Sequence, residues 1–222
     1  MELSDGVRSL RERVAKACAD VGRREDEIVV IAATKTVPVE RINELRGYGI
    51  TDVGENRVQE FLTKYTPSTP LKWHIIGALQ SNKVKSVVGK AALIQSVDRI
   101  SLADEIDKIS ARENVVSEVL IEINACGEMS KSGVSPGSLD ELASYVGALK
   151  NVRLKGIMSV PPVAAEYKTY ELIYKLYENT RKKHPEADIL SLGMSGDFET
   201  AIKCGSNMIR IGRALFGERT YV

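Results

Sequence analysis

The sequence predicts an α/β fold, a single (β/α)8 barrel of the TIM type with an extra helix before its first strand. Three observations lead to this prediction. Eight short apolar runs alternate with helix-length segments along the chain. No linker-like or repetitive segment divides the 222 residues, so we expect residues 1–222 to form one domain. The turn after the first run lacks the glycines typical of a doubly wound open sheet, the alternative that fits the alternation nearly as well.

The first helix and the first strand are the clearest elements. Apolar residues at helical spacing predict an opening amphipathic helix that ends at Gly22. Six apolar residues then run from Ile28 to Ala33, and Lys35 follows where the run stops. A run of this kind suits a strand buried on both faces. Because barrels carry their chemistry at the carboxyl ends of the strands, Lys35 is a candidate functional residue, although a lysine can simply reach solvent there.

The remaining elements follow in order. Further apolar runs predict strands at 51–53, 73–76, 93–98, 116–123, 154–158, 188–192 and 208–212. Helices are expected between them at 39–48, 58–64, 79–87 and 100–113, after 138, at 166–182, before 205 and at 214–217.

Composition excludes several classes of function. The formal net charge of +1 gives no electrostatic case for nucleic acid. Three widely spaced cysteines indicate reduced thiols, and with only two histidines a zinc site or a histidine-based triad is not expected. No signal peptide and no run long enough to cross a membrane is present. We therefore expect a soluble cytoplasmic protein without metal, nucleic-acid or membrane partners.

The ends of the eight predicted strands should meet at one mouth of the barrel. The polar and sulfur-containing residues at these ends are Lys35, Asn56, His74, Asp98, Asn124, Met158, Ser195 and Arg210. Barrels often bind phosphate with the loops after strands seven and eight. These loops read Gly193-Met194-Ser195-Gly196 and Arg210-Ile211-Gly212-Arg213, which offer close backbone approach and a hydroxyl donor. The interpretation requires Asp197 and Glu199 to point away from the anion.

A lysine facing a phosphate site leaves two chemistries open. The lysine could form a Schiff base with a phosphorylated sugar, as in an aldolase, or it could hold pyridoxal phosphate. Arg210, beside the last phosphate loop, is placed to meet a pyridine nitrogen, which favours pyridoxal phosphate.

Six motifs in order carry a family resemblance over about residues 28–217. They are Ala33-Thr34-Lys35-Thr36, Gly54-Glu55-Asn56-Arg57-Val58-Gln59-Glu60, Trp73 through Lys83, Lys131-Ser132-Gly133, Gly193-Met194-Ser195-Gly196-Asp197 and Arg210-Ile211-Gly212-Arg213. Together they resemble the pyridoxal phosphate homeostasis proteins, which are similar in fold to the amino-terminal barrel of alanine racemase.

The resemblance implies a role for each site residue. Lys35 would hold pyridoxal phosphate as a Schiff base, and Arg210 would hydrogen-bond the pyridine nitrogen. Ser195, with the backbone of Gly212 and Arg213, would bind the phosphate. Residues lining the ring would be Asn56, Met158 and Met194.

Little or no catalytic turnover is expected from such a site. An arginine can only donate a hydrogen bond, so it leaves the pyridine nitrogen neutral and the ring a poor carbanion sink. Racemisation also needs a second acid or base on the opposite face. A pyridoxal phosphate-dependent racemase of low activity is the alternative, and its candidate bases are His74, Tyr65 and Tyr167. We expect a monomer that buffers the cofactor inside the cell and passes it to apo-enzymes that depend on it.

Overall fold

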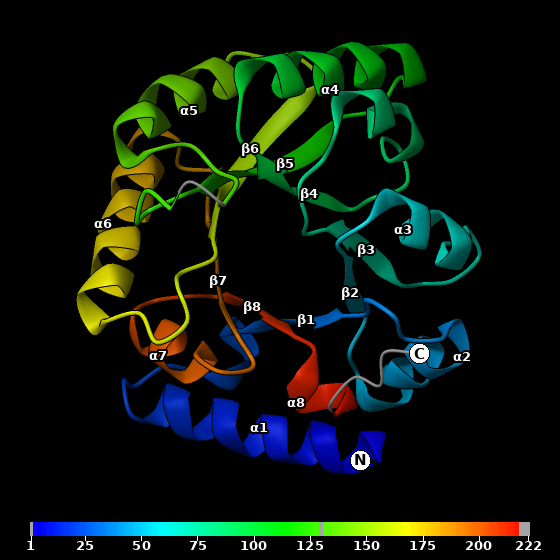
Figure 1. Cartoon of the computed structure of the whole chain (residues 1–222), viewed down its shortest axis with the longest axis vertical. Helices are drawn as coiled ribbons and strands as arrows, with labels where there is room; N and C mark the ends of the chain where they lie inside the picture. Colours follow the sequence, from blue (N-terminus) through cyan, green and yellow to red (C-terminus); the bar gives the residue numbers. More distant parts are fainter. Residues whose placement is uncertain (1, 129–130, 218–222) are drawn as a thin grey trace.

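The computed structural model describes residues 2–128 and 131–217, and in them eight parallel strands close into a barrel (Figure 1). Each strand pairs with its neighbours in chain order, and β1 pairs with β8 to complete the ring. The strands are β1 (Val29–Ala33), β2 (Asp52–Glu55), β3 (Lys72–Ile75), β4 (Leu93–Val97), β5 (Ser117–Ile123), β6 (Val152–Ser159), β7 (Ile189–Met194) and β8 (Met208–Ile211). The predicted (β/α)8 barrel is confirmed.

Helices surround the barrel on its outside (Figure 1). They are α1 (Leu3–Ala19), α2 (Val39–Glu44), α3 (Val58–Lys64), α4 (Ile100–Glu113), α5 (Leu139–Gly147), α6 (Tyr167–Lys183), α7 (Phe198–Lys203) and α8 (Arg213–Phe216). Short 3-10 segments occur at Glu25–Glu27, Leu45–Tyr48, Ser81–Ser86 and Pro136–Ser138. No helix among these described residues is long and apolar enough to cross a membrane.

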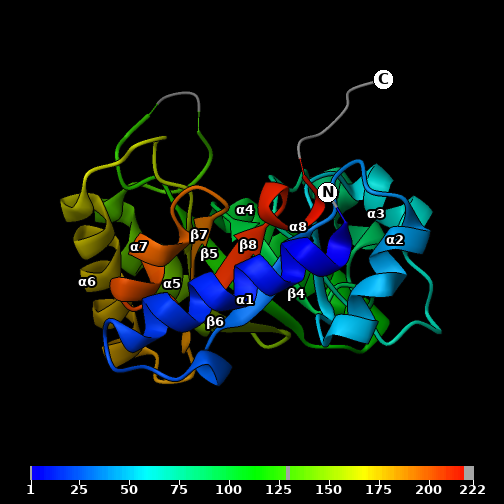
Figure 2. The ribbon, with the colours of Figure 1, turned by 90° about the horizontal axis from the view of Figure 1, so that it is seen from below.

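The predicted extra helix, α1, packs on the outside of the barrel against α7 and α8 (Figure 2). Its buried face carries Leu3, Val7, Leu10 and Val14, as the helical spacing predicts. At Gly6 a Cβ atom would lie 2.5 Å from the carbonyl oxygen of Leu215, so only glycine allows α1 and α8 to approach this closely. The last helix of the barrel is therefore clamped by the first helix of the chain.

One predicted helix takes a different form. Residues 79–87 were expected to form an α-helix, but the structure has a 3-10 helix at Ser81–Ser86 with bonds such as Lys83 N to Gln80 O, 2.9 Å. The 3-10 form rises further per residue than the α-helix, so a short segment spans more of the distance between β3 and β4. Hydrophobic spacing over a few residues cannot separate the two forms.

The barrel interior holds only a thin apolar layer. It is formed by Ile31, Leu93, Leu120, Met158 and Met208, and it is separate from the much larger core between the barrel and the helices. Because side chains alternate along a strand, the residue two positions further on also faces inward. Those next residues include Gln95 on β4, Glu122 on β5 and Arg210 on β8, and all three are buried. The interior therefore changes from apolar to polar towards the carboxyl ends of the strands.

Candidate functional site

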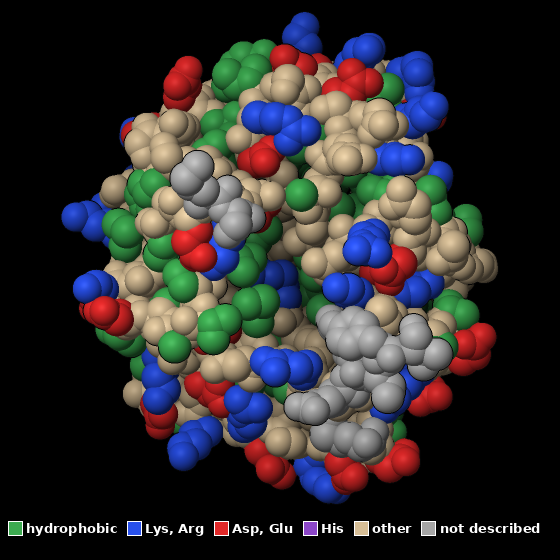
Figure 3. Space-filling view, viewed as in Figure 1, with side chains coloured by type: hydrophobic (Ala, Val, Ile, Leu, Met, Phe, Trp, Pro, Cys, Tyr) green, Lys and Arg blue, Asp and Glu red, His purple; other side chains and the backbone are tan. Residues whose placement is uncertain are grey.

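A cavity of about 700 Å³ opens at the carboxyl ends of the strands. Figure 3 shows it as a hollow in the middle of this face, with lysine or arginine side chains in and around it. Its wall is built from the ends of β1, β2, β3, β6, β7 and β8 and the loops that follow them. The predicted site residues on the wall are Lys35, Asn56, Met194, Ser195, Arg210, Gly212 and Arg213.

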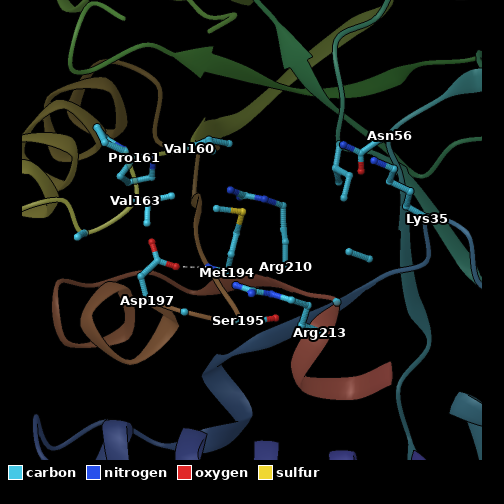
Figure 4. A pocket seen from close by; sticks show the side chains of 16 residues that line it. Lys35, Asn56, Val160, Pro161, Val163, Met194, Ser195, Asp197, Arg210 and Arg213 are labelled. Atoms are coloured by element: carbon cyan, nitrogen blue, oxygen red, sulfur yellow. Dashed lines mark hydrogen bonds between the residues drawn. The ribbon is translucent and has the colours of Figure 1, made fainter. Parts of the chain in front are cut away.

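Lys35 follows β1 by two residues and is partly buried. In the view of Figure 4, Lys35 and Asn56 lie on one side of the cavity and Ser195 and Arg213 on another. The Lys35 amine makes no hydrogen bond or ion pair with any described residue. Thr36, the next residue, has φ of +64°, a left-handed conformation that is strained for a β-branched side chain. The chain thus turns sharply just after Lys35, and the side chain of Lys35 lines the cavity.

The backbone on either side of Lys35 is held by an ionic cluster outside the barrel. Lys64 on α3 donates to Glu55 (2.7 Å) and to the carbonyl oxygen of Thr34 (2.9 Å). The Thr34 hydroxyl also donates to Glu55, at 2.7 Å. Glu60, 3.5 Å from Lys64, accepts the backbone N–H of Thr36 at 3.0 Å. Both neighbours of Lys35 are therefore fixed while its side chain is free.

The opposite wall provides hydrogen-bond donors and positive charge. Ser195 and Gly196 come from the loop after β7, and Gly212 and Arg213 follow β8. The Ser195 Oγ accepts the backbone N–H of Ala214 at 3.2 Å, so the hydroxyl hydrogen remains available to an anion. No heavy atom lies within 4 Å of an ideal Cβ at Gly196, so the backbone there is open to the cavity. This arrangement is suited to a phosphate group.

The two acidic residues near this wall are engaged elsewhere, as the phosphate interpretation requires. Asp197 accepts from the Tyr170 hydroxyl at 2.8 Å and from the backbone N–H of Met194 at 2.6 Å (Figure 4). Glu199 pairs with Arg13 of α1 at 2.6 Å. Burial and the hydrogen bond to Asp197 raise the pKa of Tyr170, which keeps this phenol neutral as a donor.

Arg210 forms the floor of the cavity between the two walls. Its side chain is buried and donates to the Ser191 Oγ at 2.6 Å and to the carbonyl oxygen of Ser159 at 2.8 Å. Burial lowers the pKa of Arg210 to about 10, partly offset by Asp197 and Glu122, so the guanidinium remains charged at neutral pH. A guanidinium has five N–H donors, and two are used here, which leaves donors for a ligand.

Sequence reasoning missed Glu122 on β5. Its side chain is buried in the barrel interior, and Oε2 has no hydrogen-bond partner. Burial and the nearby charge of Asp98 raise the pKa of Glu122 to about 7, while Arg210 lowers it. A signal was present in the sequence, because Glu122 is a charge within an otherwise apolar run, Val119 to Ile123.

Several predicted mouth residues lie elsewhere. Met158 does not line the cavity but packs in the apolar layer beneath it, two residues before Val160, which does. His74 is buried inside the barrel with both ring nitrogens engaged. Asp98 and Asn124 do not border the cavity either. The candidate second bases Tyr65 and Tyr167 are also absent from its wall: the first packs on Phe61 and the second is exposed.

Comparisons with known proteins identify the family to which the chain belongs. Residues 8–220 match the family model described as alanine racemase, N-terminal domain. The chain is 44% identical to the pyridoxal phosphate homeostasis protein of Aquifex aeolicus over 100% of both chains. Against the Escherichia coli K12 protein of the same name it is 37% identical over 99% of this chain and 98% of the relative. The chain belongs to the pyridoxal phosphate homeostasis protein family.

Solved structures show the same relationship. PipY of Synechococcus elongatus PCC7942, solved with pyridoxal phosphate bound, superposes with a TM-score of 0.79 at 28% identity, covering 92% of this chain and 100% of that one. An alanine racemase of Clostridium difficile 630 shares the fold, with a TM-score of 0.77 at 16% identity over 98% of this chain and 58% of the racemase. The resemblance expected from the six motifs is confirmed.

Proposed function

We propose that this protein binds pyridoxal 5'-phosphate in the cavity, as a Schiff base on Lys35, and acts in the homeostasis of this cofactor inside the cell. The observation that carries the proposal is that Lys35, Ser195 and Arg210, from three different strand ends, line one cavity. Its support from relatives is the family name and the PipY structure with pyridoxal phosphate bound.

The residues on the wall fit the three functional parts of this cofactor. The Lys35 amine has no partner among the described residues and can reach an aldehyde. Ser195 and the backbone of Gly196, Gly212 and Arg213 offer donors to a phosphate. The free donors of Arg210 suit a ring nitrogen that only accepts. The cavity of about 700 Å³ is also within the usual range for cofactor sites.

Low turnover follows from the same residues. When bound, pyridoxal phosphate supplies an electron sink that stabilises carbanions. Arg210 donates to the ring nitrogen and does not protonate it, which weakens that sink. No histidine or tyrosine of the described chain lines the cavity, and Asp197 is occupied by Tyr170 and Met194. Holding the cofactor and releasing it to apo-enzymes is therefore better supported than racemisation.

The test is a titration of the purified chain with pyridoxal phosphate, followed by borohydride reduction and peptide mapping. We expect a visible absorbance band to develop and the reduced adduct to map to Lys35. Lys35→Ala should lose the band and the adduct, whereas Lys85→Ala, at an exposed lysine on the 3-10 segment before β4, should keep both. A reduced adduct on other lysines of the wild-type chain, or no binding at all, would overturn the proposal.

A further inference from the structure

A row of hydrogen-bonded side chains crosses the barrel interior from the floor of the cavity. Arg210 Nη1 donates to the Ser191 Oγ at 2.6 Å, and Ser191 donates to Gln95 Oε1 at 2.7 Å. Gln95 Nε2 lies 3.2 Å from His74 Nδ1, and His74 Nε2 lies 3.0 Å from Asp52 Oδ1. We call these five residues, which come from β8, β7, β4, β3 and β2, the interior row.

The direction of donation along the interior row is fixed from both ends. Arg210 can only donate, so Ser191 accepts from it and passes its own hydrogen to Gln95. Asp52 accepts from His74: burial raises the pKa of Asp52, but the hydrogen bonds from His74 and Thr51 and the nearby charge of Lys72 hold it below its ordinary value, so the group is a carboxylate. With Nε2 of His74 donating to Asp52, Nδ1 of a neutral ring must accept from Gln95. The reverse orientation of the Gln95 amide would require a doubly protonated His74.

The interior row is shielded from water along most of its length. Gln95 and Ser191 are fully buried, and His74 and Arg210 are nearly so. Only Asp52 reaches another opening, a cavity of about 430 Å³ between α1 and the amino ends of β1 and β2. Other charged groups act only at the two ends, with Lys72 close to Asp52, and Glu122 and Asp197 facing Arg210.

A barrel core does not need such a row. Buried polar groups cost stability unless each is bonded, and apolar side chains fill an interior at lower cost. Other inward-facing positions of the barrel are filled in that way, by Ile31, Leu120 and Met208 among others. The row ends on the guanidinium of Arg210 at the floor of the cavity, which suggests that the row serves to direct that guanidinium.

We propose that Gln95, Ser191 and His74 are positioning residues for Arg210, which hold its remaining N–H groups turned into the cavity. The proposal rests on the proposed function. Because Gln95 links Ser191 to His74, a change in the middle of the row should alter both ends: the hydrogen bonding of His74 and the affinity for pyridoxal phosphate.

The first test is Gln95→Glu, which keeps the shape of the side chain but replaces the Nε2 donor with an acceptor. We expect His74 to take up a second proton and the affinity for pyridoxal phosphate to fall about tenfold. The protonation of His74 is measured without cofactor by ¹⁵N NMR of the imidazoles, with the second histidine, His184, as internal reference. In the wild-type chain Nδ1 of His74 should carry no proton, because it accepts from Gln95 Nε2. A wild-type His74 that is charged, or that carries its proton on Nδ1, would overturn the row.

The second test compares two serines. Ser191→Ala removes a hydroxyl of the interior row, whereas Ser110→Ala removes an equally buried hydroxyl that pairs with Ser117 between α4 and β5, at 2.8 Å. We expect Ser191→Ala to weaken pyridoxal phosphate binding about tenfold and Ser110→Ala to leave it unchanged. Equal affinities for wild type and Ser191→Ala would overturn the positioning role alone. A wild-type chain that binds no pyridoxal phosphate would overturn the proposed function as well.

Discussion

Two of the cations that line the cavity, Lys35 and Arg210, are supported in opposite ways. Among the residues that the structure describes, the side chain of Lys35 has no partner. Only the backbone beside it is fixed, through Glu55, Lys64 and Glu60 outside the barrel. Arg210 is fixed by its own guanidinium from inside the barrel. In the proposed function the Lys35 amine forms and releases a covalent bond and needs free movement, whereas Arg210 acts as a hydrogen-bond donor and works best when held in one direction. The protein separates the two tasks by placing one support on each face of the sheet.

The outer support, which is the ionic cluster of Glu55, Lys64 and Glu60, gives the largest expected effect on stability when it is broken. In Lys64→Met the buried carboxylate of Glu55 loses its counterion, so we expect a loss of about 4 kcal/mol, typical of a broken buried ion pair. Urea unfolding measures it. Lys108→Met, which breaks an exposed pair with Glu105 on α4, is the matched control and should change little. A similar small effect in both variants would mean that the outer support does not stabilise the turn at Lys35.

Glu122, whose charge acts on Arg210 inside the barrel, should make the stability of the fold depend on pH. Its pKa in the fold is about 7, above the ordinary 4.5, so its contribution to stability is fully present below 4.5 and is lost as the pH rises through 7. The loss is about 3 kcal/mol. Glu122→Gln should therefore match the wild type near pH 4.5 and exceed it in stability above pH 7. Unfolding curves at both pH values test this, and parallel pH profiles of the two proteins would contradict it.

The wall proposed to bind the phosphate, formed by Ser195, Gly196, Gly212 and Arg213, should give a smaller effect, on ligand binding rather than on folding. Ser195→Ala removes a hydroxyl that faces the cavity, and we expect the affinity for pyridoxal phosphate to fall by about 2 kcal/mol, as for a lost hydrogen bond to a charged group. Affinity for pyridoxal, which lacks the phosphate, should not change. Unchanged binding of both compounds would place the phosphate elsewhere in the cavity.

The smallest effect on stability is expected at Lys35 itself. Its amine has no partner among the described residues, so Lys35→Ala should change the free energy of unfolding by no more than about 0.5 kcal/mol. The same variant is the one expected to lose the visible band. A strongly destabilised Lys35→Ala would show that the lysine is a structural residue, and the contrast with Arg210 would not hold.

The sequence was sufficient for the barrel and for the residues at the strand ends. Lys35, Ser195 and Arg213 follow apolar runs directly, and parallel strands bring such residues to one mouth. Inside the strands the sequence was less informative. A strand buried on both faces shows no alternation, so nothing in the run Leu93 to Val97 says that Gln95 faces the interior. Met158 was expected on the wall of the cavity because the strand was predicted to end there, but β6 continues to Ser159 and Met158 lies in the layer beneath.

Because β1 pairs with β8, the barrel can close only after the last strand has been synthesised, and we expect ligand binding to wait until then. Ile31 of β1 is paired with Arg210 of β8, so the first and last strands to leave the ribosome supply the lysine and the arginine of one cavity. A nascent chain that lacks β8 has Lys35, but it lacks Arg210 at the floor of the cavity and Gly212 and Arg213 of the proposed phosphate-binding wall. Capture of the cofactor should therefore report that synthesis has passed the last strand.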